Sequence, residues 1–131
     1  IETTVPSALN PLISCDNRSE YVGQYTDDGT EAYDAFILNY GSIINLNTHN
    51  KLKFKLYSSS SIQVLAKLEG GSAIEKWSDF SATNTWQEFS YDFSDSIDNE
   101  NTTLVLFFNA GQNNGNPDDI YYIDELRWEE N

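Results

Sequence analysis

Residues 51–57 read KLKFKLY, a run in which lysines alternate strictly with leucine and phenylalanine. Successive side chains of a β-strand point to opposite faces, so the run predicts a strand with Leu52, Phe54 and Leu56 in a core and the lysines in water. An amphipathic helix would instead repeat its apolar residues every three or four positions. The chain is therefore expected to build a sheet with one buried face.

Further runs rich in β-branched and aromatic residues are separated by turn-forming clusters such as TDDG, SSSS and EGGS. We expect a short strand at the extreme N-terminus and strands near residues 19–26, 33–40, 51–57, 61–69, 86–93, 102–109 and 119–128. Residues 70–85 are interpreted as a long loop. The pattern predicts one all-β domain over residues 1–131, an antiparallel β-sandwich or jelly roll of eight to ten strands with almost no helix.

The alternation also predicts which side chains form the core. Residues 104–108 are apolar on both faces, which is typical of a central strand. The remaining strands each present one apolar face. The expected core contains Phe54, Leu56, Val64, Leu68, Phe89, Tyr91 and Leu106.

The last predicted strand places a carboxylate in an apolar setting. In period two, Asp124 shares a face with Tyr122, Leu126 and Trp128. An unpaired buried carboxylate is costly, so Asp124 must reach water, a proton, a cation or a metal.

Charge and composition exclude several classes of function. The chain has 21 acidic and 7 basic residues, a net charge of −14, so nucleic acid and anionic membranes would repel it. Cys15 is the single cysteine, which excludes an internal disulfide and a cysteine-based zinc cluster. His49, the single histidine, lies in a polar stretch that does not favour a catalytic triad. No segment approaches the ~20 apolar residues of a membrane-spanning helix.

Three stretches carry a family resemblance: VGQY with DAFILN downstream, KLEGG followed by NTWQEFSYDFS, and LVLFFNAGQNNGNPDDIYYIDEL. In order and over residues 1–128, they resemble the jelly-roll carbohydrate-binding modules of family 4 and related modules appended to secreted bacterial laminarinases. The resemblance implies a two-sheet β-sandwich that binds glycan without catalysis. It also implies a monomeric module that is covalently linked to a catalytic domain in a secreted or cell-surface bacterial protein. The start at Ile1 is interpreted as that of a domain excised from such a longer chain.

The same resemblance implies a structural calcium ion where the two ends of the module meet. It assigns as ligands Glu2 and Asp124, with further oxygens from Asp16, Asn17 and Ser19. Calcium takes six to eight oxygen ligands, including backbone carbonyls, so these side chains are only part of a shell. The alternative is that Asp124 lies at the rim of the sandwich in a hydrogen bond or paired with Arg18.

A glycan site needs exposed aromatic rings, which stack on the apolar faces of sugars, and planar polar side chains for the hydroxyl groups. Trp77 is the best candidate ring because its neighbours are polar. Tyr33 matches a position that is often aromatic in the family. Trp86 and Trp128 are more readily explained by packing. The outward positions of the strands are expected to add Gln63, Lys67, Gln87 and Asn109.

The strong negative charge favours a neutral ligand, and the resemblance alone selects a β-1,3-glucan such as laminarin. Two other classes of function stay open. Paired carboxylates could support glycosidase chemistry, although 131 residues are few for a hydrolase with its cleft. A calcium-stabilised structural or adhesion sandwich that binds no glycan is the other. Within the binding class, a module for a different polysaccharide is the alternative to one for β-1,3-glucan.

Overall fold

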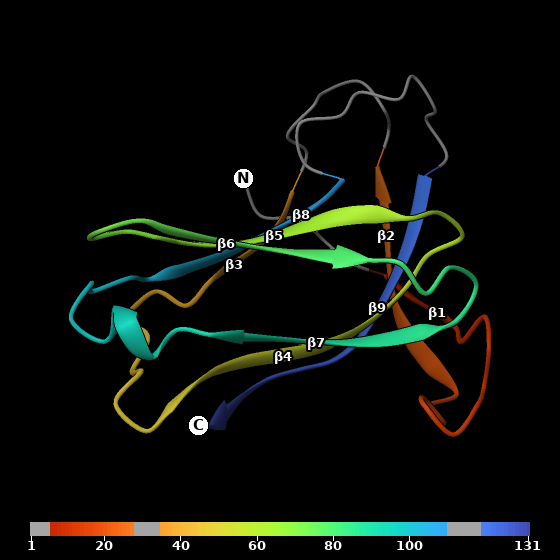
Figure 1. Cartoon of the computed structure of the whole chain (residues 1–131), viewed down its shortest axis with the longest axis horizontal. Helices are drawn as coiled ribbons and strands as arrows, with labels where there is room; N and C mark the ends of the chain where they lie inside the picture. The colour runs from red at the N-terminus through yellow and green to blue at the C-terminus, as the bar shows by residue number, and fades with distance from the viewer. Residues whose placement is uncertain (1–5, 28–34, 110–118) are drawn as a thin grey trace.

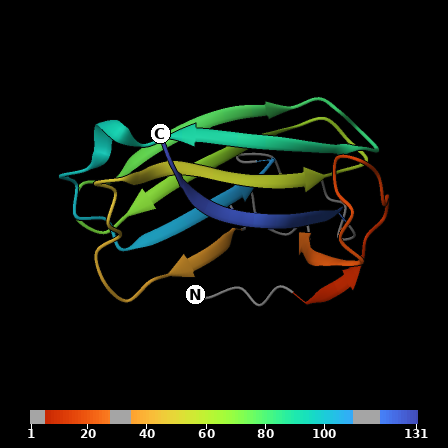
Figure 2. The same cartoon turned by 90° about the horizontal axis from the view of Figure 1, so that it is seen from below.

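The computed structural model describes residues 6–27, 35–109 and 119–131, and this part of the chain forms two antiparallel sheets packed face to face (Figures 1 and 2). One sheet has the strand order β1-β2-β9-β4-β7 and the other β3-β8-β5-β6. The predicted β-sandwich is confirmed. The strands are β1 (Ser7–Leu9), β2 (Tyr21–Asp27), β3 (Phe36–Asn39), β4 (His49–Tyr57), β5 (Ile62–Glu69), β6 (Ile74–Phe80), β7 (Trp86–Asp92), β8 (Thr103–Phe108) and β9 (Asp119–Glu130), with one 3-10 turn at Ser94–Ser96.

The core lies between the sheets and follows the predicted alternation. Leu52, Phe54 and Leu56 are fully buried, while the lysines between them are partly exposed. All seven predicted core residues are buried. The Tyr91 hydroxyl crosses the core and donates a hydrogen bond to the Val64 carbonyl oxygen at 3.0 Å, linking β7 to β5. Burial raises the pKa of Tyr91 well above its usual value, so this hydroxyl remains a donor.

Two further expectations concern the four-stranded sheet. Strand β8 lies between β3 and β5, as its apolar character on both faces predicted. The expectation of a loop over residues 70–85 is wrong, because β6 occupies its centre and forms an edge of this sheet. The inner face of β6 includes Lys76 and Ser78, so its sequence lacks a continuous apolar alternation. Lys76 is accommodated because its ammonium lies 5.5 Å from the Phe93 ring centre and bonds Asp95 at 3.0 Å.

A β-bulge in β9 changes which of its side chains face the core. Lys55 pairs with Asp124 and Lys53 with Arg127, so β9 contains one residue more than β4 between the two pairs. Glu125 takes the extra position with φ of 52°. The bulge moves Trp128 to the inner face, opposite Leu52, while Asp124 keeps the outer position opposite Lys55. The expectation that Asp124 shares a face with Leu126 and Trp128 is therefore wrong.

The β5–β6 turn depends on two glycines with positive φ, Gly70 at 80° and Gly71 at 51°. The Asn101 side chain supports this turn by donating to the carbonyl oxygens of Gly70 at 2.7 Å and Ser72 at 2.8 Å. A Cβ atom on Gly71 would lie 2.0 Å from the Asn99 carbonyl oxygen.

No helix in the described part of the chain is long and apolar enough to cross a membrane.

Gly71→Ala should therefore destabilise the fold more than a glycine substitution that meets only backbone strain. Gly41 is the matched control, because its φ is 72° and nothing lies within 4 Å of an added Cβ. A left-handed conformation costs an alanine roughly 1–2 kcal/mol, which is the expected loss for Gly41→Ala. Gly71→Ala should lose at least about 1 kcal/mol more, because the Asn99 backbone must move. Equal free energies of unfolding in urea for the two variants would contradict this account of the turn.

Candidate functional site

The outer face of the four-stranded sheet carries an open apolar hollow of about 390 Å³, lined by Leu65, Lys67, Glu75, Trp77 and Phe107. Its centre is a row across three strands, because Leu65 of β5 pairs with Trp77 of β6 on one side and with Phe107 of β8 on the other. Residues in register on one face of a sheet are neighbours. The hollow thus has an aromatic side chain from a different strand at each side of Leu65.

Trp77 is the exposed ring of this site. Its residue exposure is 51%, whereas Leu65 at the floor of the hollow is 4% exposed. The pattern of β6 explains this orientation, since Glu75, Trp77 and Asp79 alternate outward with less exposed residues between them. A large apolar ring held on a strand beside an apolar floor can stack against a flat apolar face of a ligand.

Charged and amide side chains surround the hollow. The Lys67 ammonium bonds Glu69 at 3.0 Å, and Lys67 pairs in register with Glu75. The hydrogen bond to Glu69 raises the pKa of Lys67 above its usual value, and the charges of Glu69 and Glu75 add to this effect against desolvation. Lys67 is therefore a cationic donor at neutral pH.

The structure brings together most of the residues predicted to bind ligand. Gln63 and Trp77 lie on the outer face with Lys67, and the Gln63 side chain donates to Asp79 at 3.4 Å. Asn109 follows β8 next to Gln63, and its backbone N–H donates to the Gln63 carbonyl oxygen at 2.8 Å. Tyr33 lies outside the described residues.

Gln87 does not belong to this group, and its expected outward orientation is wrong. It pairs with Leu56, which is fully buried, so it occupies an inner-face position at the end of β7. Its amide donates to the Asp79 carbonyl oxygen at 2.9 Å and accepts from the Ser81 N–H at 3.2 Å. Gln87 therefore holds the β6–β7 connection.

The sequence interpretation did not identify Leu65, Glu75 or Phe107 as parts of the site. Phe107 lies in a strand that is apolar on both faces, and this pattern predicts that all of its side chains are buried. The available signal was that Phe107 alternates with the inward residues Leu106 and Phe108. That parity places its ring on the outer face, where Trp77 also lies.

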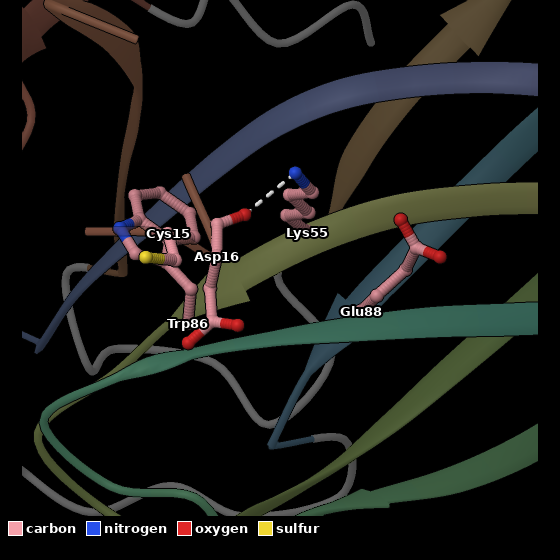
Figure 3. A pocket seen from close by; sticks show the side chains of 5 residues that line it. All are labelled: Cys15, Asp16, Lys55, Trp86 and Glu88. Carbon is pink, nitrogen blue, oxygen red and sulfur yellow. Dashed lines mark hydrogen bonds between the residues drawn. The ribbon is translucent and has the colours of Figure 1, made fainter. Parts of the chain in front are cut away.

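The other two tryptophans have structural roles, as expected. Trp86 is 4% exposed, and its indole N–H points to Asn10 Oδ1 and the Leu12 carbonyl oxygen, each at 3.0 Å. It lies beside a second hollow of about 290 Å³ on the outer face of the five-stranded sheet, lined also by Cys15, Asp16, Lys55 and Glu88 (Figure 3). The centre of the Trp128 ring lies 5.8 Å from the centre of the Phe93 ring.

The residues predicted to bind calcium meet in part. Asn17 Nδ2 donates to Asp124 Oδ2 at 3.0 Å, and Asn17 Oδ1 accepts the Ser19 N–H at 2.9 Å. Asp16 is exposed, and its carbonyl oxygen accepts from the Lys55 ammonium at 2.6 Å. Glu2 lies outside the described residues.

The described members of this set, Asp16, Asn17, Ser19 and Asp124, are not arranged as ligands of a calcium ion. Calcium needs oxygen atoms, but Asn17 presents an N–H donor to Asp124 and uses its oxygen for Ser19. Within residues 6–27, 35–109 and 119–131, no group of three His, Cys, Asp or Glu side chains converges. The calcium ion stays a prediction, and the observed partner of Asp124 is the amide of Asn17.

Asp124→Ala should destabilise the protein, because it leaves the Asn17 Nδ2 group without its acceptor in a residue that is 1% exposed. An unsatisfied buried polar group costs about 1–3 kcal/mol, and urea unfolding measures the loss. Glu130→Ala is the control, an exposed carboxylate on the same strand whose removal should change the free energy of unfolding little. In the double variant Asn17→Ala/Asp124→Ala, the two losses should be less than additive. Full additivity would argue against the hydrogen bond.

No family model matches the chain, and no curated protein matches it. Solved structures do match. The carbohydrate-binding module TmCBM61, solved in complex with β-1,4-galactotriose, is similar with a TM-score of 0.60 at 13% identity, covering 97% of this chain and 82% of that chain. The family 11 module of the cellulosomal cellulase Lic26A-Cel5E of Clostridium thermocellum has a TM-score of 0.59 at 11% identity, covering 98% and 82%.

A structure of a family 4 module, CBM4, is similar with a TM-score of 0.52 at 14% identity, covering 85% of this chain and 70% of that chain. The alignments span most of the sandwich while few residues are identical. The resemblance found in the sequence is thereby confirmed at the level of architecture: this chain has the β-sandwich fold of carbohydrate-binding modules.

Proposed function

We propose that this chain is a non-catalytic module that binds a neutral polysaccharide on the outer face of its four-stranded sheet. The observation that carries the proposal is Trp77, a half-exposed ring in register with Leu65 and Phe107 beside an open apolar hollow. Sugar rings have apolar faces that stack on aromatic rings, and hydroxyl edges that need polar partners. Both kinds of group are present here.

The row of residues suggests how a polysaccharide lies on this face. Neighbouring strands are about 4.8 Å apart, so Trp77 and Phe107, two strands apart, are separated by roughly 10 Å across the sheet. That distance is longer than one sugar ring, so a chain of sugars crossing the strands can contact both side chains. Gln63 and Asp79 lie on one side of this row and Lys67 on the other, where they can bond the hydroxyl groups.

Charge favours a neutral ligand over an anionic one. Glu69, Glu75 and Asp79 are exposed or partly exposed around the hollow, Lys67 is the cationic side chain among its lining residues, and the whole chain carries a net charge of −14. Uronic or sulfated polysaccharides would meet this negative field. The sequence resemblance to laminarinase modules supports a β-1,3-glucan. The galactotriose bound by TmCBM61 makes β-1,4-galactan the first competitor to test.

The same reasoning extends to the parent protein. We infer a bacterial secreted or cell-surface protein in which this monomeric module is covalently linked to a glycoside hydrolase and holds it on its polysaccharide. The sequence resemblance and the fold shared with the family 11 module of a cellulase support this inference. Retention of the linked enzyme on insoluble glucan, with and without the module, tests it.

Affinity electrophoresis separates the three classes of function. The protein should be retarded in gels that contain laminarin, without release of reducing sugar. Release of sugar would instead indicate an enzyme. Normal mobility across laminarin, galactan, cellulose derivatives and xylan would favour a structural sandwich.

Trp77→Ala should weaken laminarin binding about tenfold or more, equivalent to about 1.4 kcal/mol, because it removes the stacking surface. Its melting temperature should change little, since the ring is half exposed. Tyr21→Ala is the matched control, because Tyr21 is 57% exposed on β2 of the other sheet. Of the two variants, only Trp77→Ala should show reduced retardation. Normal binding by Trp77→Ala would place the ligand elsewhere, and unfolding would show that Trp77 is part of the core.

A further inference from the structure

The segment 14–19 is fixed to the sandwich through Asn17, whose backbone carbonyl oxygen and side-chain amide are both hydrogen-bonded. Its backbone carbonyl oxygen accepts from the Ser14 N–H at 3.0 Å and from the Asn10 amide at 3.2 Å. Its side chain accepts from the Ser19 N–H and donates to Asp124 of β9. Since Asn17 is 1% exposed, these bonds replace those to water.

Lys55 holds the same segment from a second direction. Its ammonium donates to the Asp16 carbonyl oxygen at 2.6 Å and pairs with Glu125 Oε2 at 2.5 Å, so it lies between the segment and β9 (Figure 3 shows the bond to Asp16). A backbone carbonyl and a carboxylate are the kinds of oxygen that calcium takes. Here they surround the ammonium group of a lysine on β4.

This arrangement opposes a divalent cation at the same place. A metal ion among Asp16, Asn17 and Asp124 would meet the N–H donor of Asn17, and it would lie close to the positive charge of Lys55. Like charges at short range repel, more strongly when they are partly desolvated. The side chain of Lys55 is 20% exposed.

We propose that the Lys55 ammonium and the Asn17 amide take the place of the structural calcium ion that the sequence resemblance implies. The segment 14–19 is then joined to β9 by protein groups alone, and the fold of this module is independent of calcium. The proposal does not rest on glycan binding, because its groups lie on the five-stranded sheet and on the segment that precedes β2.

The first test measures melting temperature by circular dichroism, and it uses Lys51→Met as the control for Lys55→Met. Both lysines are partly exposed on the outer face of β4, but Lys55 bonds the segment. The wild type should melt at the same temperature in EDTA and in millimolar calcium chloride. Lys55→Met should melt several degrees lower than Lys51→Met. A wild-type melting temperature that rises in calcium, or equal melting of the two variants, would overturn the proposal.

The second test converts the amide to a calcium ligand. Asn17→Asp places a second carboxylate within hydrogen-bond distance of Asp124, so the variant should melt below the wild type in EDTA and recover part of the loss in calcium. Magnesium, which keeps its bound water more strongly, should restore less. An Asn17→Asp variant that ignores calcium would show that Asn17 does not occupy a ligand position and would overturn the assignment. If it folds only with calcium, the proposal is supported.

Discussion

The β-bulge at Glu125 determines which side chains of β9 face the core and which one contacts Lys55. Strand β9 lies between β2 and β4, so a change of facing within it affects both neighbours. Before the bulge, Ile123 faces the core; after it, Trp128 does. The extra residue also places the Glu125 carboxylate beside Lys55, and Lys55 reaches the segment before β2. Because of this one added residue, Trp128 packs against the core, and Glu125 pairs with the lysine that bonds the segment 14–19.

The two outer faces of the sandwich differ in kind. On the five-stranded sheet, the side chains of Lys53, Glu88, Arg127 and Glu129 form a connected set of ion pairs. Such exposed pairs each contribute about 0–1 kcal/mol, and their charges are already partnered. On the four-stranded sheet, by contrast, Trp77 covers only part of an apolar hollow. Because the ion pairs and the hollow lie on different sheets, replacing Trp77 removes none of these pairs.

The sequence predicted the fold well where alternation was strict and poorly where it was not. Strand β4 and the seven core residues followed directly from period two. Strand β6 was missed because Lys76 and Ser78 lie on its inner face. The prediction that Trp128 shares a face with Asp124 was wrong because the bulge in β9 cannot be recognised from the residue pattern. The exposure of Trp77 was predicted from its polar neighbours, although the residue lies on a strand and not in a loop. Phe107 was not found, because its exposure depends on what the neighbouring strands leave uncovered.

The Asn101 amide, which supports the β5–β6 turn, also begins the tripeptide Asn-Thr-Thr, and Asn17 begins Asn-Arg-Ser. Both match the acceptor motif for N-linked glycosylation. A glycan would be attached to the same nitrogen that donates to Gly70 and Ser72, or to Asp124, in residues that are 2% and 1% exposed. The linkage replaces one of the two hydrogens of the amide nitrogen, so a glycosylated Asn101 could not make both bonds, and a sugar at either residue conflicts with its burial. Recombinant protein is better produced in a host without this modification, or with Thr103 and Ser19 replaced by alanine.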